Sequence, residues 1–231
     1  MRELVLDTET TGLDPASGDR VVEIGCVELV NHFPTGETWH TYINPERDMP
    51  QAAYEVHKLS EEFLSDKPVF SAVAEAFLEF IGADTLVIHN ASFDTGFLNA
   101  ELAMLELPPI KATRVIDTLA LARRKHPGAS NSLDALCKRY QIDASSRTTH
   151  GALIDSELLA KVYVELIGGQ QANLELSAKA LARRAHGSVD QATVRPAPLP
   201  ERLTAEHYAK HRSFVATLGG NAIWKRYLDA E

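Results

Sequence analysis

The distribution of apolar and polar residues predicts three strands in the first part of the chain. Residues 4–6 are a short apolar run, and residues 21–29 carry apolar side chains on both faces, which is typical of a mostly buried strand. Residues 38–43 form the third strand, and the preceding Pro34 and Gly36 are interpreted as turn residues. Because such short connections join neighbouring strands, we expect an antiparallel meander.

After residue 68 the apolar spacing changes from that of strands to that of helices. The pattern predicts helices separated by two further strands, so that the chain combines a mixed sheet of five strands with helices packed on its faces, an α/β fold. The elements expected in this part are a helix over 69–80 ended by Gly82, a strand over 85–88, a helix around 97–105, a strand beginning at Val115, a helix capped by Asn131-Ser132, and a helix over 152–167.

The chain divides into a body and an extension. Residues 1–169 form the predicted domain, and residues 170–200, rich in Ala, Gln and Pro, are interpreted as a flexible linker. Residues 201–231 are predicted to be a tail with one helix over 203–218. The tail has too few apolar residues to fold alone but more than a solvated tail needs, so we expect a partner to bind it, with Trp224 as an aromatic anchor.

Composition excludes several classes of protein. Apolar residues make up 45% of the chain and charged residues 24%, which excludes wholesale disorder. No apolar run approaches the ~20 residues of a membrane-spanning helix, so we expect a soluble, cytoplasmic protein without membrane contact. The two cysteines, Cys26 and Cys137, lie in apolar contexts and are expected to be reduced core residues.

Charge is distributed unevenly between the two parts. Residues 1–167 contain 14 Lys and Arg against 26 Asp and Glu, a net of −12, whereas residues 168–231 carry a net of +3. An acidic body repels nucleic acid unless cations or a partner assist, which argues against a simple nucleic-acid-binding module. The same charge is compatible with an enzyme whose carboxylates hold metal ions.

Four carboxylates and one histidine stand out, although each has an ordinary structural explanation. Asp7 and Glu9 are two apart, so both project from one face of a strand end. Asp94 follows an apolar strand, where it could cap a helix, but Ser92 could do so equally well. His150 and Asp155 can reach one point only if His150 lies in the loop before the helix that carries Asp155.

Taken together, these residues indicate a catalytic metal site. Four acidic groups, each beside the end of an element, match the oxygen ligands of two Mg²⁺ or Mn²⁺ ions. A loop histidine beside them is a candidate general base.

Three segments then carry a family resemblance: Asp7-Thr8-Glu9-Thr10-Thr11-Gly12-Leu13, His89-Asn90-Ala91-Ser92-Phe93-Asp94 and His150-Gly151-Ala152-Leu153-Ile154-Asp155. They are similar to the three exonuclease motifs of the DEDD superfamily, in its histidine-containing branch. Residues 131–137 and 147–150 further resemble the proofreading exonucleases of bacterial replicative polymerases. The resemblance covers residues 1–170 and implies a ribonuclease-H-like fold, two divalent metal ions and 3′→5′ release of nucleoside 5′-monophosphates.

The same resemblance implies roles for individual residues. It makes Asp7, Glu9, Asp94 and Asp155 metal ligands and His150 the general base. The segment from Val56 to Leu59 resembles the part of the family that contacts the terminal nucleotide, so substrate binding is assigned to His57 and Gln51, as well as to Asp7, Glu9 and Asp155. Leu13 and Phe93 could stack on the terminal base, although core packing is the preferred interpretation for Phe93.

The extension is interpreted through the same family. Residues 171–176 resemble a short sliding-clamp-binding motif, with Gln171, Leu174 and Leu176 as contacts. The expected partners are the catalytic subunit of a replicative DNA polymerase, the clamp and a DNA 3′ end. Two other functions compete with this one: a stand-alone exonuclease acting on RNA or single-stranded DNA, and an inactive scaffold. The intact acidic set argues against the scaffold, and the tail argues against the stand-alone enzyme.

Overall fold

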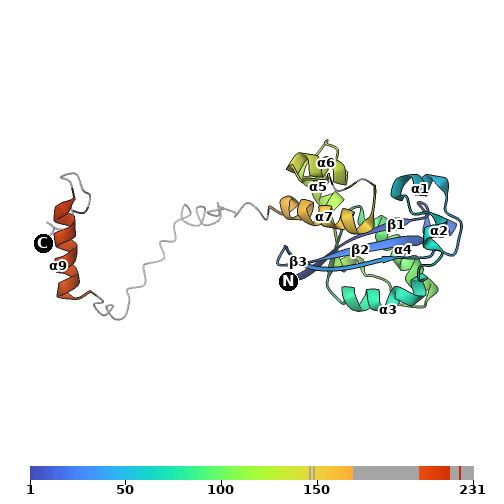
Figure 1. Cartoon of the computed structure of the whole chain (residues 1–231), viewed down its shortest axis with the longest axis horizontal. Helices are drawn as coiled ribbons and strands as arrows, with labels where there is room; N and C mark the ends of the chain where they lie inside the picture. The colour runs from blue at the N-terminus through green and yellow to red at the C-terminus, as the bar shows by residue number, and fades with distance from the viewer. Residues whose placement is uncertain (146, 148, 169–202, 219–223, 225–231) are drawn as a thin grey trace, which may run out of the picture. The chain divides into compact units, whose positions relative to one another are not determined.

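The computed structural model describes residues 1–145, 147, 149–168, 203–218 and 224 (Figure 1). Contacts divide the chain into two compact units, Met1–Leu174 and Glu175–Glu231, which are described separately. The first unit contains the sheet and the second contains one described helix.

The sheet of the first unit has five strands: β1 (Arg2–Thr10), β2 (Val21–Val30), β3 (Phe33–Tyr42), β4 (Thr85–Ile88) and β5 (Val115–Asp117). Their spatial order is β3-β2-β1-β4-β5. The first three strands pair antiparallel, whereas β4 pairs parallel with both β1 and β5. The predicted mixed sheet and antiparallel meander are therefore confirmed. The parallel strands β1, β4 and β5 end at one edge, where sites in α/β sheets usually form.

Helices cover both faces of this sheet (Figure 1). On one face, α3 (Phe70–Ile81) and α4 (Ala91–Met104) pack on a core that includes Leu4 and Leu6 of β1. On the other face, α7 (Ala152–Leu166) packs on a second core that includes Val5. Since side chains alternate along a strand, the odd-numbered residues of β1 face α7.

The remaining helices of this unit are shorter. They are α1 (Gln51–His57), α2 (Glu61–Leu64), α5 (Thr118–Lys125) and α6 (Leu133–Tyr140), with two single 3₁₀ turns, η1 (Pro15–Ser17) and η2 (Ala112–Arg114). The predicted cap of α6 is confirmed, because the Ser132 hydroxyl accepts from the Ala135 amide at 3.3 Å. The apolar pattern did not predict α1, α2 and α5. Each has at most eight residues, fewer than the about 11–18 over which a helical period is recognised, and α6, of the same length as α5, was predicted from its cap.

The third strand begins five residues earlier than its pattern predicted. Pro34 and Gly36 lie within β3, not in a turn, and the turn is made by Asn31 and His32, which have φ angles of 52° and 69°. Proline is tolerated there because β3 is an edge strand, where one row of amides needs no partner. β1 is also longer than the apolar run at 4–6 and includes both acidic residues of the first motif.

The helix predicted over 69–80 is confirmed as α3, which begins and ends one residue later than predicted. Val69 is the residue that precedes the helix, and Gly82 follows its end, as predicted. The buried positions are Phe70, Ala74, Phe77 and Ile81. Because these residues are three or four apart, they form the stripe that packs on the sheet.

Both cysteines are free and buried, as predicted. Among the described residues, no helix is long and apolar enough to cross a membrane.

In the second unit, α9 (Ala205–Thr217) confirms the helix predicted over 203–218. It begins with a capping box in which Thr204 and His207 hydrogen-bond to each other's backbone amides. Val215 is buried, whereas Phe214 is 61% exposed. The Trp224 ring packs edge-on to His211, with 5.8 Å between ring centroids. The predicted linker, with Gln171, Leu174 and Leu176, lies outside the described residues.

Candidate metal centre and active site

The C-terminal half of β1 places two carboxylates beside α7. Asp7 and Glu9 have the same parity as Val5, so they project from the face that α7 covers. In the register of the β1–β2 pair, Glu9 lies opposite Glu23, a further buried acid, which pairs with His40 at 2.7 Å. The strand therefore brings carboxylates together at its end, as the sequence predicted.

The N-terminus of α7 lies unusually close to the sheet, and this approach positions Asp155. A Cβ atom on Gly25 would lie 2.3 Å from the carbonyl carbon of Ala152, so only glycine fits at this point of β2. The Ser156 hydroxyl donates to the Gly25 carbonyl at 2.9 Å and fixes the contact. Asp155, in the first turn of α7, is consequently buried next to Glu9.

Asp94 comes from the opposite layer but is held against the same strand. Its Oδ1 accepts hydrogen bonds from the Thr8 amide at 3.0 Å and the Thr8 hydroxyl at 2.7 Å. The residue at the cap position of α4 is Asn90, in a left-handed turn with φ 64°, and its side chain makes no capping bond. The alternative of Asp94 as a helix cap is therefore wrong, since its carboxylate binds the sheet edge.

Burial, together with repulsion from neighbouring acids, raises the pKa values of Glu9, Asp94 and Asp7. The pKa of Glu9 is about 8, mainly because of burial and then because of Asp155 and Glu23. The pKa of Asp94 is about 7, again mainly because of burial. That of Asp7 lies well above its ordinary value through burial and the charges of the neighbouring acids. Without bound cations, ionising this cluster is therefore unfavourable.

His150 precedes α7 in the loop, where the sequence analysis expected it. Its Nδ1 lies 3.2 Å from Asp155 Oδ2, and its side chain is 47% exposed. One ligand atom from each of Glu9, His150 and Asp155 lies within 4.8 Å of the other two. Carboxylate oxygens facing each other in a buried site suit Mg²⁺ or Mn²⁺, so the residues present fit a divalent cation.

One cation of the protein itself reaches this cluster, and the sequence analysis gave it no role. The Arg147 guanidinium contacts both oxygens of Asp155, with Nε–Oδ1 at 2.5 Å and Nη2–Oδ2 at 2.6 Å. Its Nη2 also lies 2.6 Å from His150 Nδ1. The available signal was the family resemblance of residues 147–150; the loop has no regular period from which the direction of the Arg147 side chain could be predicted.

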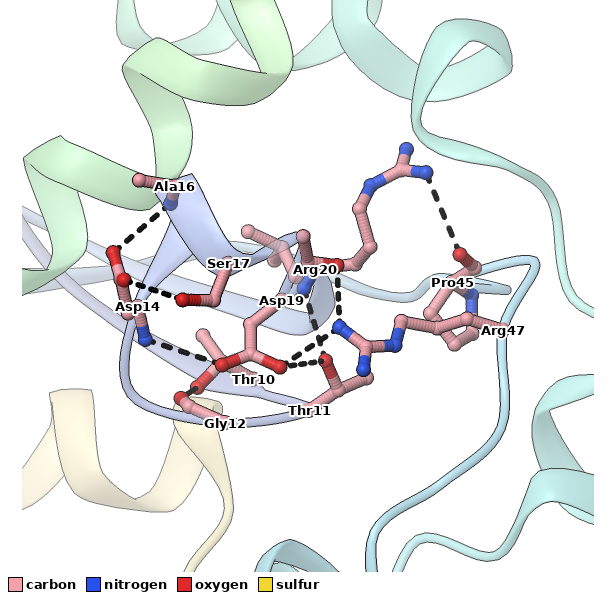
Figure 2. Close-up of polar contacts among 12 residues, drawn as sticks. Thr10, Thr11, Gly12, Asp14, Ala16, Ser17, Asp19, Arg20, Pro45 and Arg47 are labelled. Atoms are coloured by element: carbon pink, nitrogen blue, oxygen red, sulfur yellow. Dashed lines mark hydrogen bonds and ion pairs between the residues drawn. The ribbon is translucent and has the colours of Figure 1, made fainter.

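The loop that follows β1 is held by its own polar network (Figure 2). A Cβ on Gly12 would lie 2.1 Å from the Asp19 carboxylate, so the loop closes tightly against that side chain. Asp19 accepts from the Asp14 amide at 3.2 Å and from Arg47 at 2.8 Å. Since Arg47 lies just before α1, this ion pair joins the β1 loop to the segment leading into α1.

Between this loop and α1 lies a cavity of about 540 Å³ that opens beside Glu9. Its apolar walls include Leu13, which is 84% exposed, Val56 and Phe93. Phe93 also packs on Phe97, with 5.0 Å between ring centroids, so it serves the core as well as the cavity.

Of the two residues assigned to substrate binding on α1, one lines this cavity. His57 is buried there and accepts from the Leu59 amide through Nδ1 at 3.0 Å. Burial lowers its pKa and favours the neutral ring. Its Nε2 has no hydrogen-bond partner of good geometry among the described residues. Gln51 is exposed at the first position of α1, bonds Glu55 at 3.0 Å and is not among the lining residues.

Comparisons with known proteins agree with this geometry. Residues 4–163 match the family model described as Exonuclease. The chain is 50% identical to the DNA polymerase III subunit epsilon of Rickettsia prowazekii, over 93% of the chain and 96% of that protein.

Two solved structures are similar in fold. Exonuclease X in complex with 5′-overhanging duplex DNA superposes with a TM-score of 0.58 at 27% identity, over 72% of this chain and 92% of that one. The nuclease domain of 3′hExo, a DEDDh family member bound to rAMP, gives a TM-score of 0.64 at 18% identity, over 73% and 92%. The predicted ribonuclease-H-like fold and family resemblance are confirmed.

Proposed function

The chain belongs to the exonuclease family, among the DNA polymerase III epsilon subunits, and we propose how its own residues remove a nucleotide. It is a 3′→5′ exonuclease that proofreads DNA synthesis within the DNA polymerase III assembly. The observation that carries the mechanism is the convergence of buried carboxylates and His150 at one end of β1. A stand-alone exonuclease is not favoured, since the similarity to epsilon subunits extends over 93% of the chain.

Asp7, Glu9, Asp94 and Asp155 are the proposed ligands of two divalent ions, Mg²⁺ or Mn²⁺. When bound, such a pair stabilises the attacking and leaving oxygens of a phosphodiester during in-line displacement. The strand, α4 and α7 hold these carboxylates in place before any ion arrives, through Thr8 and through the close approach at Gly25. The raised pKa values of Asp7, Glu9 and Asp94 support cation binding, since a cation favours the charged form of each of these acids.

His150 is the proposed general base. The exposed side of its ring faces solvent, from which an attacking water can approach, and the ring is tethered through Nδ1 close to Asp155. If Nδ1 carries the proton and donates to Asp155, Nε2 is free to accept a proton from that water. The products are a nucleoside 5′-monophosphate and a strand shortened by one residue.

The cavity beside Glu9 is the proposed site of the terminal nucleoside. Leu13, Val56 and Phe93 offer apolar surface to the base. The Nε2 of His57 carries the ring proton because Nδ1 accepts from Leu59, and we propose that it turns from the Thr10 backbone to donate to an oxygen of the bound sugar or phosphate. Gln51 remains a proposed substrate contact, although it does not line the cavity.

Beyond the body, we propose that residues 201–231 bind the alpha subunit of DNA polymerase III and that Gln171, Leu174 and Leu176 bind the sliding clamp. The exposed Phe214 and the aromatic Trp224 support the first contact, since aromatic groups dominate binding when buried by a partner. Ending the chain at Gly168 should abolish association with alpha while hydrolysis of short single strands continues. The expected compartment of such an assembly is the cytoplasm.

The experiment that tests the function offers the protein 3′-terminated DNA and RNA single strands with Mg²⁺, and repeats the assay with chelator. We expect release of deoxynucleoside 5′-monophosphates from the DNA 3′ end, abolished by chelator. Efficient cleavage of RNA with little cleavage of DNA would contradict the proofreading assignment, and activity that persists in chelator would contradict the metal site.

A further inference from the structure

Arg147 holds three groups of the site at once. Its guanidinium spans both oxygens of Asp155, contacts His150 Nδ1 and pairs at its other end with Asp134. Arg147 is 9% exposed and Asp155 is 5% exposed, so the contact between these two side chains is screened little by water. Asp134 is 70% exposed and lies in the first turn of α6, which makes it an anchor outside the carboxylate cluster.

Arg147 competes with a divalent ion for Asp155. Its Nη2 hydrogen-bonds Oδ2 at 2.6 Å, its Nε forms an ion pair with Oδ1, and Oδ2 also lies near His150. A divalent ion that takes Asp155 as a ligand meets a positive charge already placed against that carboxylate. Because charge-assisted contacts of this kind are among the stronger polar contacts in proteins, the competition lowers the net affinity for the ion.

The same contact determines which nitrogen of His150 carries the proton. When Arg147 Nη2 donates to Nδ1, the neutral ring has its proton on Nε2, which then cannot accept one from water. When Arg147 withdraws, Nδ1 can donate to Asp155 and leave Nε2 free. One side chain thereby links the ligand Asp155 to the protonation pattern required of the base.

We propose that Arg147 is a positioning residue of the exonuclease site: in the metal-free protein its guanidinium stands in for a cation between Asp155 and His150, and it must leave Asp155 when a divalent ion binds. This inference rests on the proposed metal site. The ion pair with Asp134 keeps the displaced guanidinium near the site. When the ion dissociates, Arg147 can therefore bind Asp155 again.

The test is the affinity for Mn²⁺ of the full chain, measured by electron paramagnetic resonance or calorimetry without substrate. We expect Arg147→Gln to bind Mn²⁺ about tenfold more tightly than wild type, the order of effect that groups around metal ligands have. Arg147→Lys keeps the charge but cannot fork across both oxygens, so it should also bind more tightly than wild type. If the effect were only long-range charge, the lysine variant would match wild type, which would overturn the proposal.

Arg139→Gln is the matched control. Arg139 lies on α6 and bonds the Ser130 carbonyl at 3.0 Å, away from Asp155, so its loss should leave Mn²⁺ affinity unchanged. Equal affinity in wild type and both Arg147 variants would overturn this inference while leaving the metal site intact. Absence of Mn²⁺ binding by the wild type would overturn the metal site and this inference together.

A second readout follows the His150 ring itself, by long-range ¹⁵N–¹H NMR correlations of the metal-free protein. We expect the proton on Nε2 in wild type at a pH where the ring is neutral, and on Nδ1 in Arg147→Lys. The same change should occur in wild type when Mg²⁺ is added. A merely structural role of Arg147 would leave the pattern unchanged, and an Nδ1 proton in metal-free wild type would contradict the proposal.

Discussion

Glu3 and Glu9 lie on the same face of β1, but different groups surround them at the two ends of the strand. Glu3 is fully buried and is met by the Tyr163 hydroxyl at 2.7 Å and by His32 at 2.7 Å. Glu9 is 9% exposed and is met mainly by other acids. At the first end the Tyr163 hydroxyl and the His32 ring face the Glu3 carboxylate, whereas at the second end the carboxylates face mainly one another, an arrangement that favours a bound cation.

The difference extends along α7, which covers both ends. Its later turns supply Tyr163 to Glu3, and its first turn supplies Asp155 to the acidic cluster. Proteins commonly retain unfavourable local interactions where function requires them. Substitutions at the two ends should therefore have opposite consequences: loss of stability at the Glu3 end, and loss of activity without loss of stability at the Glu9 end.

The largest expected effect comes from neutralising the carboxylates at the Glu9 end of β1, called the acidic end below. Asp7→Asn, Glu9→Gln, Asp94→Asn or Asp155→Asn should each reduce exonuclease turnover by more than ~10³-fold, the upper range for removal of one electrostatic contact to a transition state. Each variant removes a proposed ligand oxygen without changing side-chain size. Turnover is measured on a 3′-terminated single strand at saturating Mg²⁺, with circular dichroism as a control for folding. A variant that retains near-normal turnover is not a ligand.

His150→Ala should lower turnover by ~10²–10⁴, the usual contribution of a general base. Because the ring is proposed to accept the proton of the attacking water, the pH dependence of turnover should differ between wild type and the variant. The pH–rate profile of both proteins at saturating Mg²⁺ checks the expectation. An unchanged profile would show that another group accepts the proton.

At the opposite end of β1, Tyr163→Phe should change stability and leave chemistry intact. Removing the hydroxyl deprives a fully buried carboxylate of a donor, which costs about 1–3 kcal/mol of the free energy of unfolding. Urea denaturation measures that loss, and turnover per folded molecule should match wild type. The comparison fails if the variant is as stable as wild type or if its turnover falls in parallel with the acidic-end variants.

Much of the acidic end could be predicted from sequence because its residues flank elements that have a clear period. Asp7 and Glu9 follow an apolar run, and Asp155 lies in the first turn of a strongly apolar helix. Two features could not be predicted. The contact at Gly25 joins residues far apart in the chain, and Arg147 acts from a loop whose direction depends on tertiary packing.

The residues that line the cavity were also predicted only in part, because tertiary packing positions them. His57 was assigned a role through family resemblance, but α1, which positions it, is only seven residues long and begins at Gln51 without a side-chain cap. The strand ends were also misplaced where tertiary pairing decided them, as at Pro34 on the edge strand. Most differences between the prediction and the structure occur in short elements, because packing against neighbouring elements stabilises them and their own residues are too few to show a regular apolar period.

A smaller expected effect is the pH dependence of stability in the metal-free protein. The folded-state pKa of Glu9 is about 8, against 4.5 for an unperturbed glutamate, so the folded protein binds a proton more tightly than the unfolded chain. Stability should therefore decrease as pH rises from 4.5 to 8 in the presence of chelator, with a fall in melting temperature on the order of several °C. Glu9→Gln should flatten this dependence. A melting temperature that rises over the same interval would contradict the assigned environment of Glu9.

The most direct test of the central claim, that the acidic end of β1 is arranged for a cation, compares melting temperatures of wild type and Glu9→Gln in chelator and in saturating Mn²⁺. In chelator the variant should melt at a higher temperature than wild type, because one repelling carboxylate has been removed. Mn²⁺ should raise the melting temperature of wild type and have a much smaller effect on the variant. A variant that melts below wild type in chelator and gains as much from Mn²⁺ would contradict the account.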